Sequence, residues 1–152
     1  MEIGDTVPDF ELLDQNGAVT RLSQLLGSGP VVVFFYPAAM TKGCTAESCH
    51  FRDLAAEFAA LAAQRIGISA DAVDTQRKFS DLHGFDYPLL SDTEGSVARI
   101  FGVKRSFGPL PVKRWTFVIG TDCKVLGVVK SELRMDLHAD RALEILRSSK
   151  AP

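Results

Sequence analysis

Two of the three cysteines in this chain lie in a pattern that could support redox chemistry. Cys44 and Cys49 are five residues apart, and Cys123 lies far from both in the sequence. Three cysteines are an odd number and too few for a disulfide-stapled scaffold, which a chain of 152 residues does not need. We therefore expect the cysteines to serve chemistry rather than architecture.

Cys44 is predicted to occupy the first turn of a helix that follows a buried strand. There the free backbone N–H groups and the positive end of the helix dipole favour a thiolate, which is the nucleophilic form of cysteine. A hydroxyl at Thr41 could hold an incoming hydroperoxide, and Pro37 could shield the sulfur from bulk water. The alternative is an inert, buried cysteine that acts as a small hydrophobe, but the polar neighbours Lys42 and Thr45 favour reactivity.

Cys49 is predicted to lie further along the same helix. Five helical residues place the two Cα atoms about 8.6 Å apart, beyond the roughly 7 Å that an unstrained disulfide tolerates. A disulfide between Cys44 and Cys49 would therefore require the helix to unwind locally.

Two other kinds of site fit these side chains less well. A metal centre would draw on Cys44, Cys49, His50 and Cys123, but the spacing CxxxxCH matches none of the usual zinc patterns. A dithiol exchanger of the thioredoxin type needs a CxxC motif, which the chain lacks.

The segment that positions Cys44 begins with a continuous apolar run, residues 31–36, between Pro30 and Pro37. Such a run of β-branched and aromatic residues is typical of a strand buried on both faces, which implies helices on both sides of the sheet. Apolar residues then recur at helical spacing over residues 41–64. In open α/β sheets, ligand chemistry lies beyond the carboxyl ends of the strands, and Cys44 closely follows the most buried strand.

The remaining patterns predict alternating strands and helices, then a late hairpin and a final helix. In the helix at residues 71–82, we expect Val73, Phe79 and Leu82 to be buried. This order predicts an α/β, thioredoxin-like fold, with a mixed central sheet flanked by helices and an N-terminal β-hairpin extension. The further predicted elements are an edge hairpin within 8–20, strands at 65–69 and 87–90, a helix at 92–101, an exposed loop at 104–112, strands at 114–119 and 124–130, and a helix at 137–147.

The segment FFYPAAMTKGCTAESCHFRD is similar to the active-site region of a known family. The pattern PxxxTxxC, present as Pro37, Thr41 and Cys44, resembles the signature of peroxiredoxins. The longer string GCTxExCxFRD, at residues 43–53, resembles the peroxiredoxin Q subfamily, also called bacterioferritin comigratory protein. The segments GDTVPDFEL, GISAD and RWTFVIG also look like family segments in the right order, so the resemblance covers nearly the whole chain.

The resemblance implies a thiol-dependent peroxidase that reduces hydrogen peroxide and organic hydroperoxides. Cys44 would be the peroxidatic cysteine, which passes through a sulfenic acid, and Cys49 would be the resolving cysteine. Thioredoxin or a similar dithiol would recycle the resulting disulfide. Thr41 and Arg114 would hydrogen-bond the peroxide, and Pro37 would shield the pocket. The resemblance implies no metal and no organic cofactor.

Arg114 and Glu47 each have a functional and a purely structural interpretation. Arg114 opens a predicted strand, from which a guanidinium could reach the helix start and stabilise a thiolate, although a solvated arginine fits the sequence equally well. Glu47 belongs to the subfamily string and could modulate the site, but a carboxylate in the first part of a helix also complements the helix dipole. We expect no role in the reaction for His50, His83 or His138.

The chain departs from the family pattern near the site. Ala38, Ala39 and Met40 stand where relatives usually carry charged residues, and Lys42 stands where they often have proline, which leaves the preferred peroxide open. Cys123 occupies a turn position where relatives commonly have glycine, so we expect it to be a bystander.

The composition argues against several other classes of protein. Seventeen Lys and Arg against nineteen Asp and Glu give a formal net charge of -2, so nothing calls for a nucleic-acid partner. No apolar run approaches the ~20 residues that span a bilayer, and the first residues lack a secretory signal, which favours the cytoplasm. We expect a single domain over residues 1–152. The resemblance to the subfamily implies a monomer or a weak dimer. The alternative function is a non-enzymatic thiol sensor or interaction module.

Overall fold

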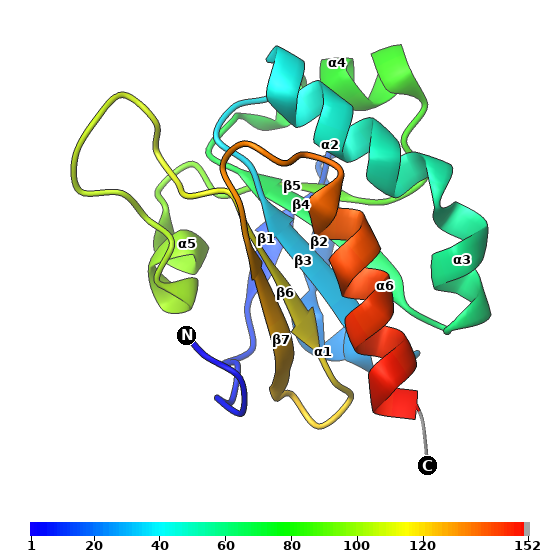
Figure 1. Cartoon of the computed structure of the whole chain (residues 1–152). Coiled ribbons are helices and arrows are strands. Elements are labelled where there is room, and N and C mark those ends of the chain that lie inside the picture. Colours follow the sequence, from blue (N-terminus) through cyan, green and yellow to red (C-terminus); the bar gives the residue numbers. More distant parts are fainter. Residues whose placement is uncertain (151–152) are drawn as a thin grey trace.

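The computed structural model describes residues 1–150, which contain a seven-stranded sheet with helices on both faces (Figure 1). The strand order is β2-β1-β5-β4-β3-β6-β7. The strands are β1 (Glu11–Leu13), β2 (Val19–Arg21), β3 (Val31–Phe35), β4 (Gln64–Ser69), β5 (Leu89–Ser91), β6 (Trp115–Ile119) and β7 (Val125–Lys130). The helices are α1 (Leu22–Leu26), α2 (Lys42–Asp53), α3 (Ala55–Ala60), α4 (Val73–His83), α5 (Ser96–Phe101) and α6 (Leu137–Lys150).

The sheet is mixed, as the sequence predicts. β3, β4 and β5 run parallel to one another, because helices connect each of them to the next. β1 is antiparallel to β5, and β6 is antiparallel to both β3 and β7. β2 forms the predicted hairpin with β1 and lies at the sheet edge. The α/β class with an N-terminal hairpin extension is therefore confirmed.

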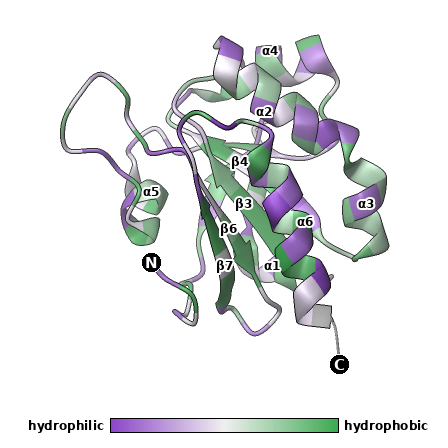
Figure 2. Ribbon diagram, in the orientation of Figure 1, coloured by the Kyte–Doolittle hydropathy of each residue, from purple (hydrophilic) through white to green (hydrophobic). Residues whose placement is uncertain are grey.

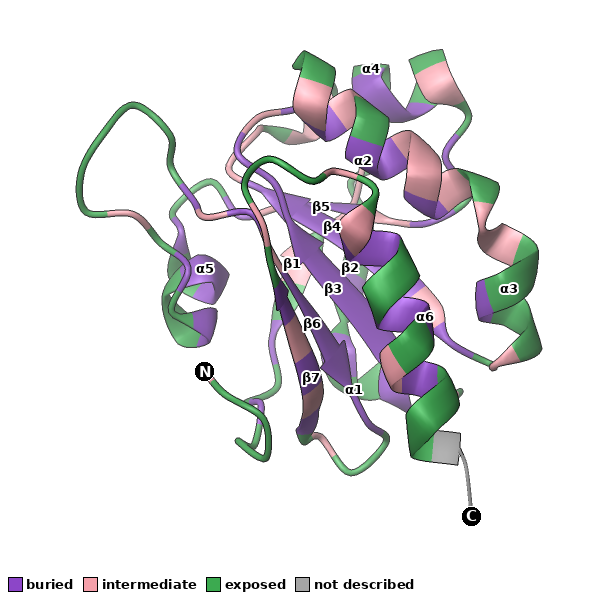
Figure 3. Ribbon diagram, in the orientation of Figure 1, coloured by how far each residue is buried: buried purple, intermediate pink, exposed green. Residues whose placement is uncertain are grey.

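β3 lies in the interior of the sheet, and all five of its residues are buried. Val31, Val33 and Phe35 belong to one apolar core together with residues of α1 and α5. Val32 and Phe34 face a second core, which α2, α3, α4 and α6 complete. Figures 2 and 3 show the result, with hydrophobic, buried strands at the centre and polar, exposed residues on the outer sides of the helices. Burial on both faces explains the continuous apolar run.

The single helix predicted over residues 41–64 is wrong, because two helices occupy this stretch. α2 and α3 are separated by Leu54, which has φ −96° and ψ 21°. Nη1 of Arg65, on β4, donates a hydrogen bond to the carbonyl oxygen of Phe51 at 2.7 Å. In a continuous helix this carbonyl would accept the amide of residue 55, so the arginine competes with the next helical hydrogen bond.

The helix predicted at residues 71–82 is α4, but part of its predicted buried face is wrong. Leu82 is 65% exposed, whereas Gln76 is fully buried. The Gln76 side chain accepts a hydrogen bond from the Tyr36 hydroxyl at 2.5 Å and donates one to Ser69 Oγ at 3.0 Å. A buried amide is tolerated when its polar atoms are paired in this way, and hydrophobic periodicity does not detect such pairing.

α1 is not among the helices predicted from the sequence, and the other differences concern where elements begin or end. α5 starts at Ser96 instead of residue 92, because the Asp92 carboxylate accepts the amides of Val97 and Ala98 and so lies in front of the helix. The loop at residues 104–112 is largely exposed, as predicted.

Among the helices of residues 1–150, none combines the length and the apolar character that crossing a bilayer requires.

Candidate active site

The loop between β3 and α2 determines where the helix begins. The Ala39 N–H donates a hydrogen bond to Asp71 Oδ2 at 2.7 Å, which ties this loop to the segment after β4. Met40 has a left-handed φ of 70°, and Thr41 is extended with φ −79° and ψ 156°. α2 starts directly afterwards, so Cys44 lies in its first turn, where the sequence predicts it.

Arg114 is the residue directly before β6, and its guanidinium reaches the Cys44 sulfur. Its Nη2 lies 3.3 Å from Cys44 Sγ, and its Nη1 lies 3.2 Å from Glu47 Oε1. Cys44 and Glu47 are fully buried, and Arg114 is only 6% exposed. One guanidinium is therefore shared between a sulfur and a carboxyl group, both on the inner face of α2.

Arg114 and Glu47 each shift the pKa of the other. Burial raises the pKa of Glu47 to about 8, although Arg114 opposes the rise by attraction and by hydrogen bonding. Burial alone would lower the pKa of Arg114, but Glu47 and Cys44 raise it above its ordinary value, so the guanidinium stays charged. A permanent positive charge therefore lies beside the Cys44 sulfur at the amino end of α2, where it can stabilise negative charge that develops during a reaction.

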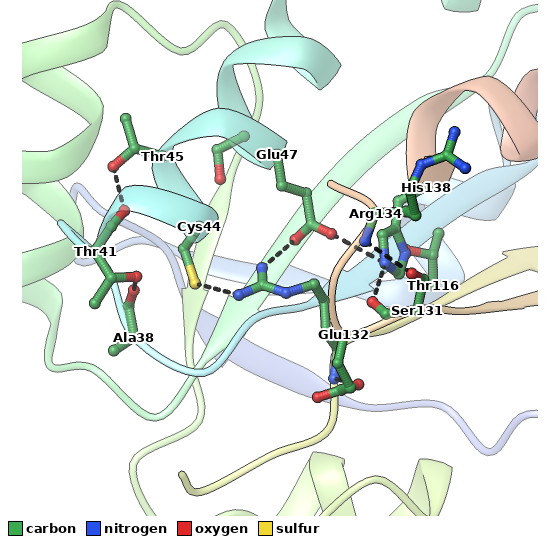
Figure 4. Close-up of polar contacts among 12 residues, drawn as sticks. Ala38, Thr41, Cys44, Thr45, Glu47, Thr116, Ser131, Glu132, Arg134 and His138 are labelled. Atoms are coloured by element: carbon green, nitrogen blue, oxygen red, sulfur yellow. Dashed lines mark hydrogen bonds and ion pairs between the residues drawn. The ribbon is translucent and has the colours of Figure 1, made fainter. Parts of the chain in front are cut away.

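Thr41 and Pro37 lie on the segment that leads into α2. The Thr41 hydroxyl donates a hydrogen bond to the carbonyl oxygen of Ala38 at 2.7 Å (Figure 4), so its hydrogen is used and its lone pairs can accept another hydrogen bond. The Thr41 side chain is exposed, whereas Pro37 is buried. Of these two residues, only Thr41 is exposed to a molecule that arrives from solvent.

Cys44 and Cys49 are both free, and Cys49 is partly buried further along α2. Burial raises the pKa of the Cys49 thiol, Arg52 opposes this rise, and Asp53 adds to it. The raised pKa favours the thiol form of Cys49. The two cysteines of α2 therefore have different electrostatic surroundings.

Cys123 packs against the core on the other face of the sheet, away from the core that contains Cys44. It has a left-handed φ of 67° in the turn between β6 and β7, and its N–H donates to the carbonyl oxygen of Gly120 at 2.9 Å. A positive φ is the reason why glycine suits this position. These facts agree with the prediction that Cys123 is a bystander.

His138 is a component of the site that sequence reasoning missed. It is fully buried at the start of α6, with Nε2 3.4 Å from Glu47 Oε2. Its Nδ1 lies 2.7 Å from Thr116 Oγ1, and its Nε2 lies 2.8 Å from the Ser131 carbonyl oxygen (Figure 4). Burial lowers the pKa of His138, so a neutral ring that donates from Nε2 to Ser131 fits these partners. Glu47 Oε2 has no hydrogen-bond partner among the described residues.

The periodicity of α6 contains a signal for this arrangement. His138 belongs to the buried stripe that also includes Ala139, Ala142, Leu143 and Leu146. An imidazole on the apolar stripe of an amphipathic helix must find polar partners in the interior. A histidine on this stripe therefore indicates a buried polar network, although the periodicity does not identify Glu47 as a member.

Gly43 directly precedes Cys44 on α2 and lies close to Met135 and to the Arg114 guanidinium. A Cβ at this position would lie 3.1 Å from Met135 Cε and 3.4 Å from Arg114 Nη2. The segment before α6 that carries Met135 also carries Glu132, whose Oε2 accepts the backbone N–H of Arg114 at 2.8 Å. The absence of a side chain at Gly43 thus lets this segment and the guanidinium approach α2 closely.

The rival idea of a metal centre finds no support in the arrangement of side chains. Within the part of the chain that the structure describes, no three His, Cys, Asp or Glu residues are grouped so that they could hold a metal ion.

Comparisons with known proteins agree with this geometry. The model of the AhpC/TSA family matches residues 3–128. A putative peroxiredoxin of Mycobacterium tuberculosis is 64% identical over 150 residues, which cover 97% of each chain. The chloroplastic peroxiredoxin Q of Sedum lineare is 38% identical over 148 residues, which cover 97% of this chain and 78% of the relative. The crystal structure of peroxidoxin BcpB from Mycobacterium tuberculosis has a TM-score of 0.95 at 63% identity and covers 99% of each chain.

These matches extend over nearly the whole chain. The structural match to a peroxiredoxin confirms the predicted thioredoxin-like fold. They also support a thiol-dependent peroxidase activity rather than a sensor or interaction module. The chain therefore belongs to the AhpC/TSA family, in its peroxiredoxin Q and bacterioferritin comigratory protein group.

Proposed function

We propose that this thiol-dependent peroxidase works through Cys44, which is oxidised to a sulfenic acid, and through Cys49, which resolves that acid as a disulfide. Its substrates are hydrogen peroxide and organic hydroperoxides, and its reductant is thioredoxin or a similar dithiol. The observation that carries the proposal is the Arg114 guanidinium, 3.3 Å from Cys44 Sγ at the amino end of α2.

In the first step, the Cys44 thiolate attacks one oxygen of the hydroperoxide. The O–O bond breaks, the sulfur is oxidised to a sulfenic acid, and the other oxygen takes up a proton and leaves as water or an alcohol. The charge of Arg114 faces the sulfur and stabilises the negative charge that moves onto the oxygens. The Thr41 hydroxyl oxygen accepts a hydrogen bond from the peroxide O–H, and Pro37 limits the access of water.

In the second step, the Cys49 thiol condenses with the sulfenic acid. An S–S bond forms, and one water molecule leaves. The helical separation of the two Cα atoms, about 8.6 Å, exceeds what a disulfide spans, so the segment between them must leave the helical conformation. An external dithiol then reduces the disulfide by thiol–disulfide exchange and becomes a disulfide itself. Recycling of this kind supports a cytoplasmic location, because that compartment supplies dithiols.

Mass spectrometry after one equivalent of hydrogen peroxide tests the proposal. Cleavage after Lys42 and Arg52 releases Cys44 and Cys49 in one peptide, residues 43–52. That peptide should become lighter by two hydrogens and resist alkylation, whereas Cys123 should still be alkylated. A peptide that stays fully alkylated while the peroxide is consumed would overturn the assignment of the two cysteines.

A further inference from the structure

Tyr87 holds α2 immediately next to Cys49. The Tyr87 hydroxyl donates a hydrogen bond to the carbonyl oxygen of Ser48 at 2.7 Å. Tyr87 lies in the connection between α4 and β5 and is only 4% exposed, and Ser48 is fully buried. This hydrogen bond therefore joins the inner face of α2 to a neighbouring segment of the fold, out of contact with solvent.

A second contact fixes α2 three residues later. Arg65 Nη1 donates to the carbonyl oxygen of Phe51 at 2.7 Å, and the Phe51 ring stacks on Phe34 at 4.2 Å between centroids. The Arg65 guanidinium also pairs with Asp86 at 2.7 Å and lies over the Tyr87 ring at 5.0 Å. The carboxyl-terminal end of α2 is thus attached by both polar and aromatic contacts.

Disulfide formation should affect the contacts of Tyr87 and Arg65 with α2 differently. In the proposed function, on which this inference rests, the segment from Cys44 to Cys49 must leave the helical conformation. Ser48 lies inside that segment, whereas Phe51 lies beyond it. When the segment unwinds, the Ser48 carbonyl has to move, and the hydrogen bond from Tyr87 has to break. The bond from Arg65 to Phe51 can persist.

We propose that Tyr87 is a positioning residue that sets the rate of the resolving step. Its hydroxyl holds the Ser48 carbonyl in the helical conformation and so delays the approach of Cys49 to the sulfenic acid. Because a net hydrogen bond of ordinary strength has to be lost before the disulfide forms, its removal should accelerate that step about 3- to 10-fold.

The delay has a chemical consequence for Cys44. A sulfenic acid that is not yet resolved can react with a second hydroperoxide, which oxidises it to a sulfinic acid and leaves as water or an alcohol. Resolution by Cys49 competes with this reaction. A faster resolving step should therefore lower the fraction of sulfinic acid that forms in excess peroxide.

The variant Tyr87→Phe tests the proposal, because it removes the hydroxyl and keeps the ring. The ring packs against Phe34 and Phe85, with centroids 5.7 Å and 5.4 Å away. Rapid quenching and mass spectrometry would measure separately the loss of the Cys44 thiol and the appearance of the disulfide. We expect an unchanged first step, a disulfide that forms about 3- to 10-fold faster, and proportionally less sulfinic acid in excess peroxide.

Tyr36→Phe is a matched control. Tyr36 is the other tyrosine of the chain, it is fully buried, and its hydroxyl donates to Gln76 on α4 rather than to α2. The control should resolve its sulfenic acid at the wild-type rate. Equal resolving rates in Tyr87→Phe and the wild type, or the same acceleration in both variants, would overturn the role of Tyr87. Failure of the wild type to form the disulfide would overturn the proposed function instead.

A measurement on the unaltered protein covers the case in which Tyr87→Phe does not fold. With 13C-labelled tyrosine, the chain gives two ring signals, which the Tyr36→Phe variant assigns. The Tyr87 signal should shift when the disulfide forms and return when a dithiol reduces it. A Tyr87 signal that is identical in the reduced and disulfide forms would show that the contact with Ser48 persists, and the proposal would be wrong.

Discussion

Arg114 donates a hydrogen bond to the Sγ of Cys44 although the two residues are 70 positions apart in the chain. The sheet explains the contact. β6 pairs antiparallel with β3, and Thr116 lies opposite Phe34, so the start of β6 meets the end of β3. α2 begins just beyond that end of β3. The pairing of two central strands therefore determines the position of the cation beside the sulfur.

Replacing Arg114 with lysine should slow the reaction with peroxide by about 100-fold. A lysine keeps the charge, but one ammonium cannot reproduce the planar fork that serves both Cys44 and Glu47. Stopped-flow measurement of peroxide consumption under single-turnover conditions would check this rate. Arg105→Lys is the control, because Arg105 pairs with the exposed residue Glu132 and does not contact the sulfur. A rate for Arg114→Lys within twofold of that control would show that the reaction with peroxide does not need the guanidinium.

Three cysteine variants should separate the roles of the thiols. Cys44→Ser should consume no peroxide, because it lacks the nucleophile. Cys49→Ser should consume one equivalent and then stop when thioredoxin is the reductant, since its sulfenic acid has no partner within the chain. Cys123→Ser should cycle normally, because Cys123 lies against the other core. Peroxide consumption coupled to a thioredoxin system measures all three. Sustained cycling by Cys49→Ser would mean that another thiol resolves the acid.

Replacing Glu47 with glutamine should change how stability depends on pH. The pKa of Glu47 is raised from 4.5 to about 8 in the folded protein. Between these values the folded protein holds a proton that the unfolded chain releases, so the stability that Glu47 contributes is complete below pH 4.5 and is lost as the pH rises through 8. A glutamine does not titrate. Its variant should therefore gain stability relative to the parent protein as the pH rises through this range.

Urea unfolding at several pH values would measure this effect of Glu47. Both proteins should carry Cys44→Ser, so that the second partner of Arg114, the Cys44 sulfur, does not contribute to the comparison. The difference in the free energy of unfolding should grow by at most about 1.4 kcal/mol per pH unit. Two unfolding curves that remain parallel from pH 5 to pH 8 would show that Glu47 is already ionised in the folded protein.

The parts of the site that the sequence predicted are those that depend on neighbouring residues. The apolar run of β3 predicts its own burial, and the residues after it predict a helix start at Cys44. Both inferences rest on short-range periodicity and on properties of helix ends. The order of strands and helices then predicts the α/β fold, because few topologies accommodate it.

The parts that could not be predicted depend on contacts between distant segments. Whether Arg114 is solvated or buried depends on the pairing of β6 with β3. The break between α2 and α3 depends on Arg65, which reaches Phe51 from β4. His138 contacts Glu47 only because α6 packs on the same face of the sheet as α2. No local pattern in the sequence contains this information.

Hydrogen exchange should divide α2 into two parts when the disulfide forms. Amides of residues 45–51 should lose protection, because the segment that carries Cys49 must unwind to bring the sulfurs together. The amide of Leu54 and the hydrogen-bonded amides of α3 should stay protected, because the Leu54 amide donates to the carbonyl oxygen of His50, beyond the segment that unwinds, and Arg65 holds the Phe51 carbonyl in place. Mass spectrometry or NMR on the reduced and oxidised protein would show the boundary. Cys49→Ser treated with one equivalent of peroxide is the control, since it forms no disulfide and should keep the helix wound. Equal exchange in the reduced and oxidised protein would contradict the unwinding, and loss of protection through α3 would contradict the anchor at Phe51.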